Sequence, residues 1–258
     1  MKIPIALSIA GSDPSGGAGI QADLKTFQRR GAYGMAAVTL LTVQNTLGVS
    51  AVDVIAPEKV EAQVRAAIED IPPGAAKTGA LGDEKIVRML ARLAEEFKFP
   101  LIVDPVMISK HGHALLTEPA RRAMAELLMP QAYLVTPNLH EAAGLAGIPV
   151  FDIESMEKAA EKIMSFGARG ALVKGGHLEG DAVDLLRFGN ETVLLRAPRI
   201  ETRHTHGTGC VYSACITAEL AKGNTLKDAV TAAKEFISSA IAAAPGLGQG
   251  SGPVNLFV

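Results

Sequence analysis

The feature that most constrains this chain is an alternation between short apolar segments of strand-forming residues and longer segments with helical periodicity. This alternation is typical of repeated strand-helix-strand units around a mostly parallel sheet, so we expect an α/β fold. We expect strands at 3–10, 36–43, 75–77, 101–104, 133–136, 171–174, 182–188 and 191–197. We expect helices at 18–30, 57–68, 83–96, 119–127, 139–146, 155–166, 208–221 and 226–243. The last two strands flank Gly189 and Asn190, which favour a two-residue antiparallel hairpin turn.

The chain reads as one domain spanning residues 1–258. A length of 258 residues with 48% hydrophobic residues is enough for one large core. No internal repeat, low-complexity tract or Pro/Ser-rich linker divides it.

Charge and composition argue against several classes of partner. A formal net charge of −2 gives no broad basic field, so nucleic acid and anionic membrane surfaces are not expected partners. The apolar run 3–10 breaks at Gly11, too early for a signal peptide. Cys210 and Cys215 are five residues apart in one helical segment and point in different directions, which argues against a disulfide between them. We therefore expect a cytoplasmic protein.

The first candidate site is the loop GSDPSGGAG at 11–19, directly after the first expected strand. Ligands of parallel α/β sheets bind beyond the carboxyl ends of the strands, and the four glycines allow close backbone approach. The loop has neither the Gly-Lys-Ser/Thr ending of a P-loop nor the dinucleotide-binding spacing. A second interpretation remains open, in which the loop is only a tight strand-to-helix connection and Asp23 a first-turn helix acid.

The second candidate is THGTGC at 205–210, which precedes a helix of small residues. Backbone N–H groups at a helix N-terminus, together with the helix dipole, suit the negative charge of a phosphoryl group in transfer. Cys210 falls in the first turn, where we expect a lowered thiol pKa. The alternative is that Cys210 is a small buried hydrophobe.

Two further strand ends carry acids, in DPVM at 104–107 and TPNLHE at 136–141. A magnesium ion bound to phosphates needs only one or two protein carboxylates, so Asp104 and Glu141 are candidate ligands, directly or through water. Glu141 also fits a helix N-terminal capping role, and both roles are compatible. Lys174 ends another strand before two glycines and is placed to reach a polyphosphate, although a lone strand-end lysine is usually solvated.

Taken together, these segments resemble the hydroxymethylpyrimidine and phosphomethylpyrimidine kinases of thiamin synthesis, a branch of the ribokinase-like superfamily. The resemblance runs along nearly the whole chain, and the order of the pieces is its specific part. The pieces are AGSDPSGGAGIQADLKT at 10–26, QNT at 44–46, KTG at 77–79, DPVM at 104–107, TPNLHEA at 136–142, KGGH at 174–177 and THGTGC at 205–210.

The resemblance implies a ribokinase-like three-layer α/β/α fold, a single kinase domain at 1–258, a homodimer, and ATP and Mg²⁺ as co-substrate and cofactor. It implies ATP-dependent phosphorylation of hydroxymethylpyrimidine and of its phosphate. The implied substrate-binding residues are Gln44, Asp23, Gly11, Ala18, Ala80 and Val106, and the implied ATP-binding residues are Lys174, Thr205 and His206. The catalytic residues would be Cys210 as base with Gly207, Thr208 and Gly209, and the metal ligands would be Asp104 and Glu141.

The sequence departs from the family pattern in two places. Ala80 stands where Met is common, which enlarges the expected pocket, and His113 replaces a commoner acid in the expected lid after KHG at 110–112. A pyridoxal kinase of the same branch is the main alternative. Some such enzymes carry a second cysteine in the lid, and 110–113 contains none, which favours the pyrimidine. A noncatalytic nucleotide or vitamin sensor is a further alternative, against which the intact loops argue.

Overall fold

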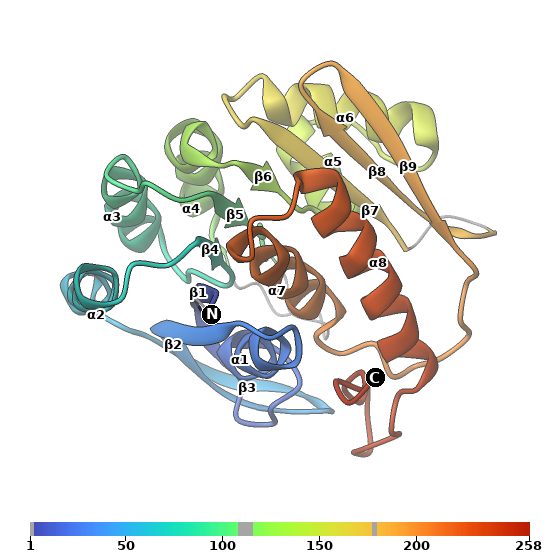
Figure 1. The fold of residues 1–258 in the computed structure, drawn as a ribbon, viewed down its shortest axis with the longest axis horizontal. Helices are drawn as coiled ribbons and strands as arrows, with labels where there is room; N and C mark the ends of the chain where they lie inside the picture. The colour runs from blue at the N-terminus through green and yellow to red at the C-terminus, as the bar shows by residue number, and fades with distance from the viewer. Residues whose placement is uncertain (1–2, 108–115, 177–179) are drawn as a thin grey trace.

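A nine-stranded sheet forms the middle layer of the molecule, with helices on both of its faces (Figure 1). The computed structural model describes residues 3–107, 116–176 and 180–258. The strands are β1 (Ile5–Ser12), β2 (Tyr33–Asn45), β3 (Gly48–Val54), β4 (Ala75–Thr78), β5 (Leu101–Val103), β6 (Leu134–Val135), β7 (Gly170–Gly175), β8 (Ala182–Phe188) and β9 (Glu191–Ala197). Their spatial order is β3-β2-β1-β4-β5-β6-β7-β8-β9. Strands β2 to β7 in the middle of this order are parallel, while β3, β8 and β9 pair antiparallel.

The helices divide into two layers, each with its own hydrophobic core (Figure 1). One layer contains α1 (Gly19–Arg29), α7 (Thr208–Ala221) and α8 (Leu226–Ala242). The other contains α2 (Pro57–Asp70), α3 (Glu84–Ala94), α4 (Glu118–Ala123), α5 (Leu139–Ala146) and α6 (Ile153–Met164). A π-helical turn (Met124–Leu128) and a 3-10 turn (Met129–Gln131) follow α4. The predicted three-layer α/β class with a mostly parallel sheet is confirmed.

Helix α7 lies close to the centre of the sheet because small residues face each other there. Ala214 and Ala218 of α7 are fully buried and pack in one cluster with Ala6 of β1. Side chains on both faces of a buried parallel strand are apolar, and the smallest ones allow the closest approach of a helix. The N-terminus of α7 is thereby brought to the carboxyl end of β1.

The chain reverses direction across the sheet at β1. After β1 it continues into the neighbouring strand β2 on one side, and after α2 it returns to β4 on the other side of β1. Such a switch point opens a crevice beyond the carboxyl ends of the two strands, and this is where ligands of open α/β sheets bind.

The helix boundaries follow from local capping signals. Asp83 precedes α3 and its carboxylate accepts from the N–H of Ile86. Asn138 and Glu141 form a reciprocal capping box at the start of α5, which confirms the capping role expected for Glu141.

Every strand and helix expected from the sequence is present, with ends shifted by a few residues. Strand β3 was not expected. It lies at the edge of the sheet, pairs only with β2, and leaves most of its side chains partly or fully exposed. Half-exposed edge strands lack the apolar run that marks a buried strand, so the sequence signal is weak.

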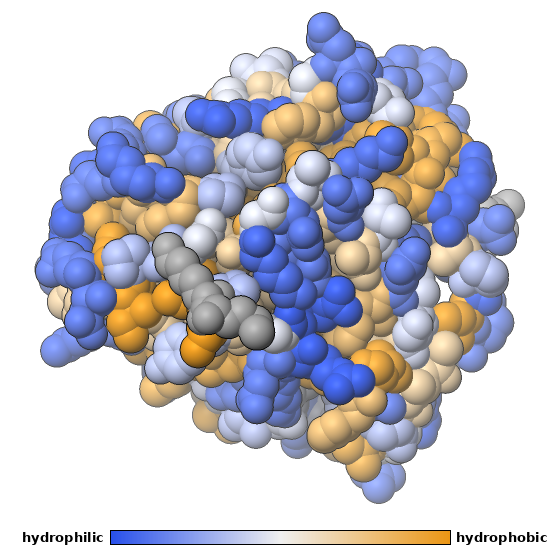
Figure 2. Space-filling view, viewed as in Figure 1, coloured by the Kyte–Doolittle hydropathy of each residue, from blue (hydrophilic) through white to orange (hydrophobic). Residues whose placement is uncertain are grey.

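The surface shown in Figure 2 is largely hydrophilic over the rim formed by α2 and α3. Arg65 of α2 forms ion pairs with Glu96, just after α3, at 3.0 Å and with Glu61 one helical turn away. Within the described residues, no helix has the length and apolarity required to cross a membrane.

Candidate active site

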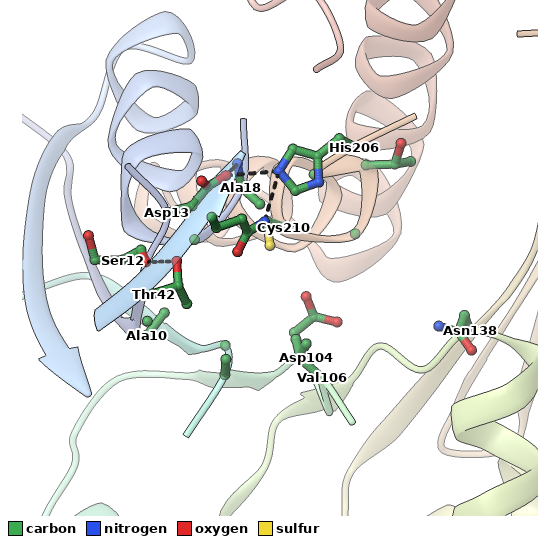
Figure 3. Close-up of a pocket in the computed structure, with 18 of the residues that line it drawn as sticks. Ala10, Ser12, Asp13, Ala18, Thr42, Asp104, Val106, Asn138, His206 and Cys210 are labelled. Carbon is green, nitrogen blue, oxygen red and sulfur yellow. Dashed lines mark hydrogen bonds and ion pairs between the residues drawn. The ribbon is translucent and has the colours of Figure 1, made fainter. Parts of the chain in front are cut away.

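A cavity of about 290 Å³ opens at the switch point between β1 and β4. Its walls come from the carboxyl ends of β1, β2, β4 and β5 and from the N-terminus of α7 (Figure 3). Its lining includes Gly11, Asp13, Ala18, Leu40, Thr42, Gln44, Ala80, Asp104, Val106, Glu141, Lys174, Thr205, His206, Gly207, Thr208, Gly209 and Cys210. The cavity therefore brings together all the residues implied by the family resemblance except Asp23.

Asp13 organises the glycine loop that forms one wall. Its Oδ1 accepts hydrogen bonds from the N–H of Ser15 at 2.9 Å and from the Ser15 hydroxyl at 2.8 Å. Its Oδ2 accepts from the N–H of Ala18 at 2.8 Å and lies 2.8 Å from Nε2 of His206. Burial raises the pKa of Asp13, but the hydrogen bonds from His206 and Ser15 outweigh it, and the pKa falls below the usual value. Asp13 was not expected as a site residue, although an Asp followed two residues later by Ser is typical of such a side-chain turn.

Strand β2 forms one wall of the cavity, because alternate side chains along a strand point to the same face. Leu40, Thr42 and Gln44 face the cavity, while Leu41 and Val43 between them are about half exposed on the other side. The Gln44 amide lies 3.3 Å from Nε2 of His206. His206 was expected on the ATP side, but its buried ring lies against the substrate-side residues Asp13 and Gln44.

The N-terminus of α7 faces the cavity with backbone rather than with a capping side chain. Gly207 is the N-cap residue, has φ of 77°, and makes no side-chain cap. A Cβ at Gly207 would overlap the carbonyl oxygen of Gly17, so only glycine permits this close approach of the two loops. The first amides of a helix have no intrahelical acceptor, and those of Gly209 and Cys210 open on the cavity lining. The arrangement can stabilise an anion.

The thiol of Cys210 lies in this first turn, but its environment does not activate it. Burial raises the pKa of Cys210 to about 12, and the nearby ammonium of Lys77 lowers it by less than burial raises it. The lowered pKa expected from the position in the helix is therefore wrong, because desolvation of a thiolate exceeds the stabilisation by one helix terminus. Cys210 and Cys215 are both free thiols.

Asp104 and Lys174 form an ion pair on the opposite side of the cavity. Nζ of Lys174 lies 3.1 Å from Oδ1 of Asp104, and the Ser213 hydroxyl donates to Oδ2 at 3.1 Å. Burial raises the pKa of Asp104, but Lys174 and the nearby Lys77 together hold it below the usual value. Figure 3 shows Asp104 across the cavity from the pair of Asp13 and His206.

Glu141 adds a second carboxylate to the same lysine. Its Oε2 accepts the N–H of Asn138 at 2.8 Å. Burial raises the pKa of Glu141 to about 7, with Lys174 lowering it and Asp104 raising it. Two carboxylates beside one ammonium leave an excess negative charge once Glu141 ionises, which fits a cation. Within the described part of the chain, no cluster of three or more His, Cys, Asp or Glu side chains has metal-site geometry. One or two carboxylates are what a phosphate-bound magnesium ion takes from a protein, and Asp104 and Glu141 fit that number.

Asp23 lies beneath the cavity and not on its lining. Its side chain is fully buried, and its Oδ1 is 2.7 Å from Nζ of Lys77. Its Oδ2 accepts the hydroxyl of Ser8 at 2.6 Å. Both carboxylate oxygens are thus engaged by Lys77 and Ser8, and Asp23 is not among the residues that line the cavity. Lys77, which was expected only as part of the KTG motif at 77–79, is its buried partner.

Two other expectations from the sequence concern residues outside the described ranges. The expected lid at 110–113, with its His113 departure, falls within residues 108–115. His177 at the end of KGGH falls within residues 177–179.

Comparisons with known proteins find kinases of two named kinds, for phosphomethylpyrimidine and for pyridoxal. The family model described as phosphomethylpyrimidine kinase matches residues 13–255. The hydroxymethylpyrimidine/phosphomethylpyrimidine kinase of Streptomyces coelicolor is 48% identical over 98% of this chain and 94% of its own length. A crystal structure of phosphomethylpyrimidine kinase from Clostridium difficile 630 matches with a TM-score of 0.82 and 41% identity, over 92% of this chain and 99% of its own. A structure of Staphylococcus aureus pyridoxal kinase in complex with AMP-PCP and pyridoxal has a TM-score of 0.89 and 37% identity, over 99% of this chain and 94% of its own.

Proposed function

The chain belongs to the phosphomethylpyrimidine kinase family, and from this premise we propose that it phosphorylates hydroxymethylpyrimidine and then hydroxymethylpyrimidine phosphate, with ATP as donor. The observation that carries the proposal is that one cavity holds two kinds of group. The side-chain amide of Gln44 can hydrogen-bond to a heteroaromatic ring, and the backbone N–H groups of 207–210 at the start of α7 can bind a phosphate. Relatives of matching length carry both activities in their names. We propose that residues 1–258 act as one kinase domain in the cytoplasm.

The substrate ring is proposed to lie between the glycine loop and the end of β4. Gly11, Ala18, Ala80 and Val106 line this part of the cavity with backbone and small apolar side chains. A flat ring buries its faces against such a surface, while a single polar side chain fixes its orientation. The amide of Gln44 can hydrogen-bond to the polar edge of such a ring.

Phosphoryl transfer is proposed to depend on the backbone amides at the start of α7. The hydroxymethyl oxygen in the first transfer, or an oxygen of the substrate phosphate in the second, attacks the γ-phosphorus as the bond to ADP breaks. Charge develops on the equatorial oxygens. The amides of Gly209 and Cys210 and the ammonium of Lys174 are placed to stabilise that charge. Thr205 and Thr208 complete the cradle, since the Thr208 hydroxyl donates to the carbonyl of Thr205 at 2.7 Å. ATP use is supported by the AMP-PCP complex of the related pyridoxal kinase.

The substrate proton is proposed to leave late, to an oxygen of the transferred phosphoryl group, and not to the side chain of Cys210. A thiol with a pKa of about 12 is protonated at neutral pH and is a poor general base. Because the transition state of phosphoryl transfer is loose, little deprotonation is needed before the phosphorus is transferred.

A magnesium ion is proposed to bind beside Asp104 and Glu141. Magnesium held by phosphates and one or two carboxylates neutralises the charge of the phosphoryl groups. The excess negative charge of the two carboxylates over Lys174 supports this assignment.

A substrate panel tests the proposed function. ATP consumption is measured with hydroxymethylpyrimidine, its monophosphate, pyridoxal and ribose, in the presence of magnesium. We expect the two pyrimidines to turn over fastest, and we expect Gln44→Ala to raise KM for both. Gln28→Ala, an exposed glutamine of α1, is the matched control.

Pyridoxal is the second candidate substrate, because pyridoxal kinases are among the related structures and pyridoxal also carries a hydroxymethyl group on a nitrogen heteroaromatic ring. The family model and the named relatives favour the pyrimidine. Faster turnover of pyridoxal than of either pyrimidine would contradict the proposed function.

A homodimer formed through β2 and β3 is proposed as the assembly. The family resemblance implies a homodimer, and Leu41, Val43, Leu47 and Val54 expose 43 to 63% of their surface on this hairpin. A second copy covering these side chains would also support the strand that carries Gln44.

A further inference from the structure

Asp13 is surrounded by hydrogen-bond donors in the loop above the cavity. The N–H of Ser15, the hydroxyl of Ser15 and the N–H of Ala18 all donate to its two oxygens. A further contact is the 2.8 Å approach of Nε2 of His206 to Oδ2. Both side chains are almost completely buried, at 2% exposure for Asp13 and 3% for His206. A carboxylate in such surroundings is ionised and accepts only, so Nε2 of His206 must carry a hydrogen.

This hydrogen decides how the Gln44 amide is oriented. The atom of the amide that the structure places 3.3 Å from the same Nε2 is Nε2 of Gln44, the NH₂ nitrogen. An NH₂ group at that place would point its hydrogens at the hydrogen of His206. The carbonyl oxygen instead faces that hydrogen favourably and shares it, at the longer distance, with Asp13. Amide oxygen and nitrogen are assigned from their hydrogen-bond partners, and here the partner requires Oε1 of Gln44 to face His206. The NH₂ group of Gln44 then points away from His206.

We propose that Asp13 and His206 form a positioning pair that holds the Gln44 amide with its carbonyl toward His206 and its NH₂ group toward the ligand. The pair would thereby favour ligands with a ring nitrogen that accepts a hydrogen bond from this NH₂ group. The inference rests on the proposed function for the identity of the ligand. It assigns to these two residues a part in specificity that acts through Gln44.

The preference should appear as a ratio between two ligands. The first is hydroxymethylpyrimidine, and the second is its analogue with C–H in place of the ring nitrogen beside the amino-bearing carbon. A site built to donate to an acceptor rejects an analogue that lacks it, because the donor is then left unpaired. We expect the parental protein to bind hydroxymethylpyrimidine at least about tenfold more tightly, which corresponds to about 1.4 kcal/mol.

Two substitutions of His206 separate positioning from simple packing. His206→Gln keeps an N–H at the position of Nε2, and we expect it to keep the tenfold preference. His206→Leu keeps the apolar volume but removes the donor, so the Gln44 amide can turn over, and we expect the preference to fall below about threefold. His204→Leu, on the same loop and outside the cavity lining, is the matched control and should keep the preference. Adding His206→Leu to Gln44→Ala should cause no further change in the ratio.

Binding is measured by calorimetry without ATP, so that turnover is not required. Full preference in a folded His206→Leu variant would overturn the inference, as would failure of His206→Gln to preserve it. Binding of the pyrimidine without phosphorylation would overturn the proposed function alone, and binding of neither ligand would overturn both.

Nitrogen-15 NMR of the histidine ring gives a test that is independent of any ligand. We expect Nε2 of His206 to be the ring nitrogen that carries the hydrogen, and we expect the side-chain amide signals of Gln44 to shift in His206→Leu. An Nε2 without a proton would overturn the inference whatever the protein phosphorylates.

Discussion

At the scale of single residues, the environment of Cys210 predicts a small role for its side chain. A thiol with a pKa of about 12 is protonated across neutral pH, and serine has nearly the same shape. We therefore expect Cys210→Ser to retain single-turnover phosphoryl transfer within about tenfold, with an unchanged profile between about pH 6 and 9. Loss of a true general base would cost about 10²- to 10⁴-fold. A loss of that size, with an unchanged thermal melt, would restore the thiol as the catalytic base.

Asp23 is expected to matter for stability and not for substrate binding. Its buried ion pair with Lys77 lies beneath the cavity, and removing one partner of such a pair leaves an unpaired buried charge that costs about 3–5 kcal/mol. We expect Asp23→Asn to lower the denaturant midpoint strongly, while the folded fraction keeps its KM. Gln28→Ala, at an exposed position of the same helix, is the control and should keep both the parental stability and the parental KM. A KM raised more than about tenfold with parental stability would place Asp23 in the substrate site.

The raised pKa of Glu141 predicts a dependence of stability on pH. The ordinary value is 4.5 and the folded value is about 7, so the folded protein binds this proton more tightly than the unfolded chain does. The resulting stabilisation is fully present below pH 4.5 and is lost as the pH rises through about 7. Glutamine cannot ionise, so without magnesium the melting temperature of Glu141→Gln relative to the parent should be higher at about pH 8.5 than at about pH 5.

Magnesium and a control variant test the cause of that difference. Added Mg²⁺ should stabilise the parent at about pH 8.5 more than Glu141→Gln, because the ion compensates the buried charge. Glu95→Gln, at an exposed position after α3, should show neither effect. A relative melting temperature of Glu141→Gln that is independent of pH would contradict the assigned environment.

At the scale of elements, the close approach of the glycine loop to the start of α7 is expected to control activity. In Gly207→Ala the added Cβ overlaps the backbone of Gly17 and the residue keeps an unfavourable positive φ. Gly223→Ala, at the other end of α7, has φ of 90° but nothing within 4 Å of the added carbon. Both variants should lose roughly 1 kcal/mol of stability from the left-handed conformation. Only Gly207→Ala should lose phosphoryl transfer, by at least about 10²-fold. Equal activities of the two folded variants would remove the amide cradle from the mechanism.

At the scale of the whole molecule, the exposed face of β2 predicts self-association. Val43 is 58% exposed and lies between two residues that line the cavity, so its own side chain points outward. We expect Val43→Lys to shift the protein from dimer to monomer in sedimentation analysis, because a charge at the centre of an apolar interface must be desolvated. Phe151→Lys, at a 68% exposed position before α6, should leave the assembly unchanged. A parental protein that is monomeric at micromolar concentration would contradict the proposed dimer.

The sequence alone determined the order of the elements and the places where function gathers. Its apolar periods mark the buried strands, and its unusual loops follow the ends of those strands, where a parallel sheet collects them at one edge. That is why Gly11, Gln44, Asp104, Lys174 and the segment 205–210 were expected together and line one cavity. The family motifs identified the class of reaction because they occur in the order that this strand topology requires.

The tertiary structure alone decided which of these groups are free to act. Asp23 is engaged by Lys77, which is 54 residues away, and Asp13 is joined to His206 across 193 residues. The pKa of Cys210 rises because the segments packed around this partly buried residue desolvate its thiol, an effect that its place in a helix does not reveal. Strand β3 exists because β2 offers it an edge and not because of its own pattern. Periodicity depends on residues that are close in the sequence. Burial and side-chain pairing depend on residues that only folding brings together.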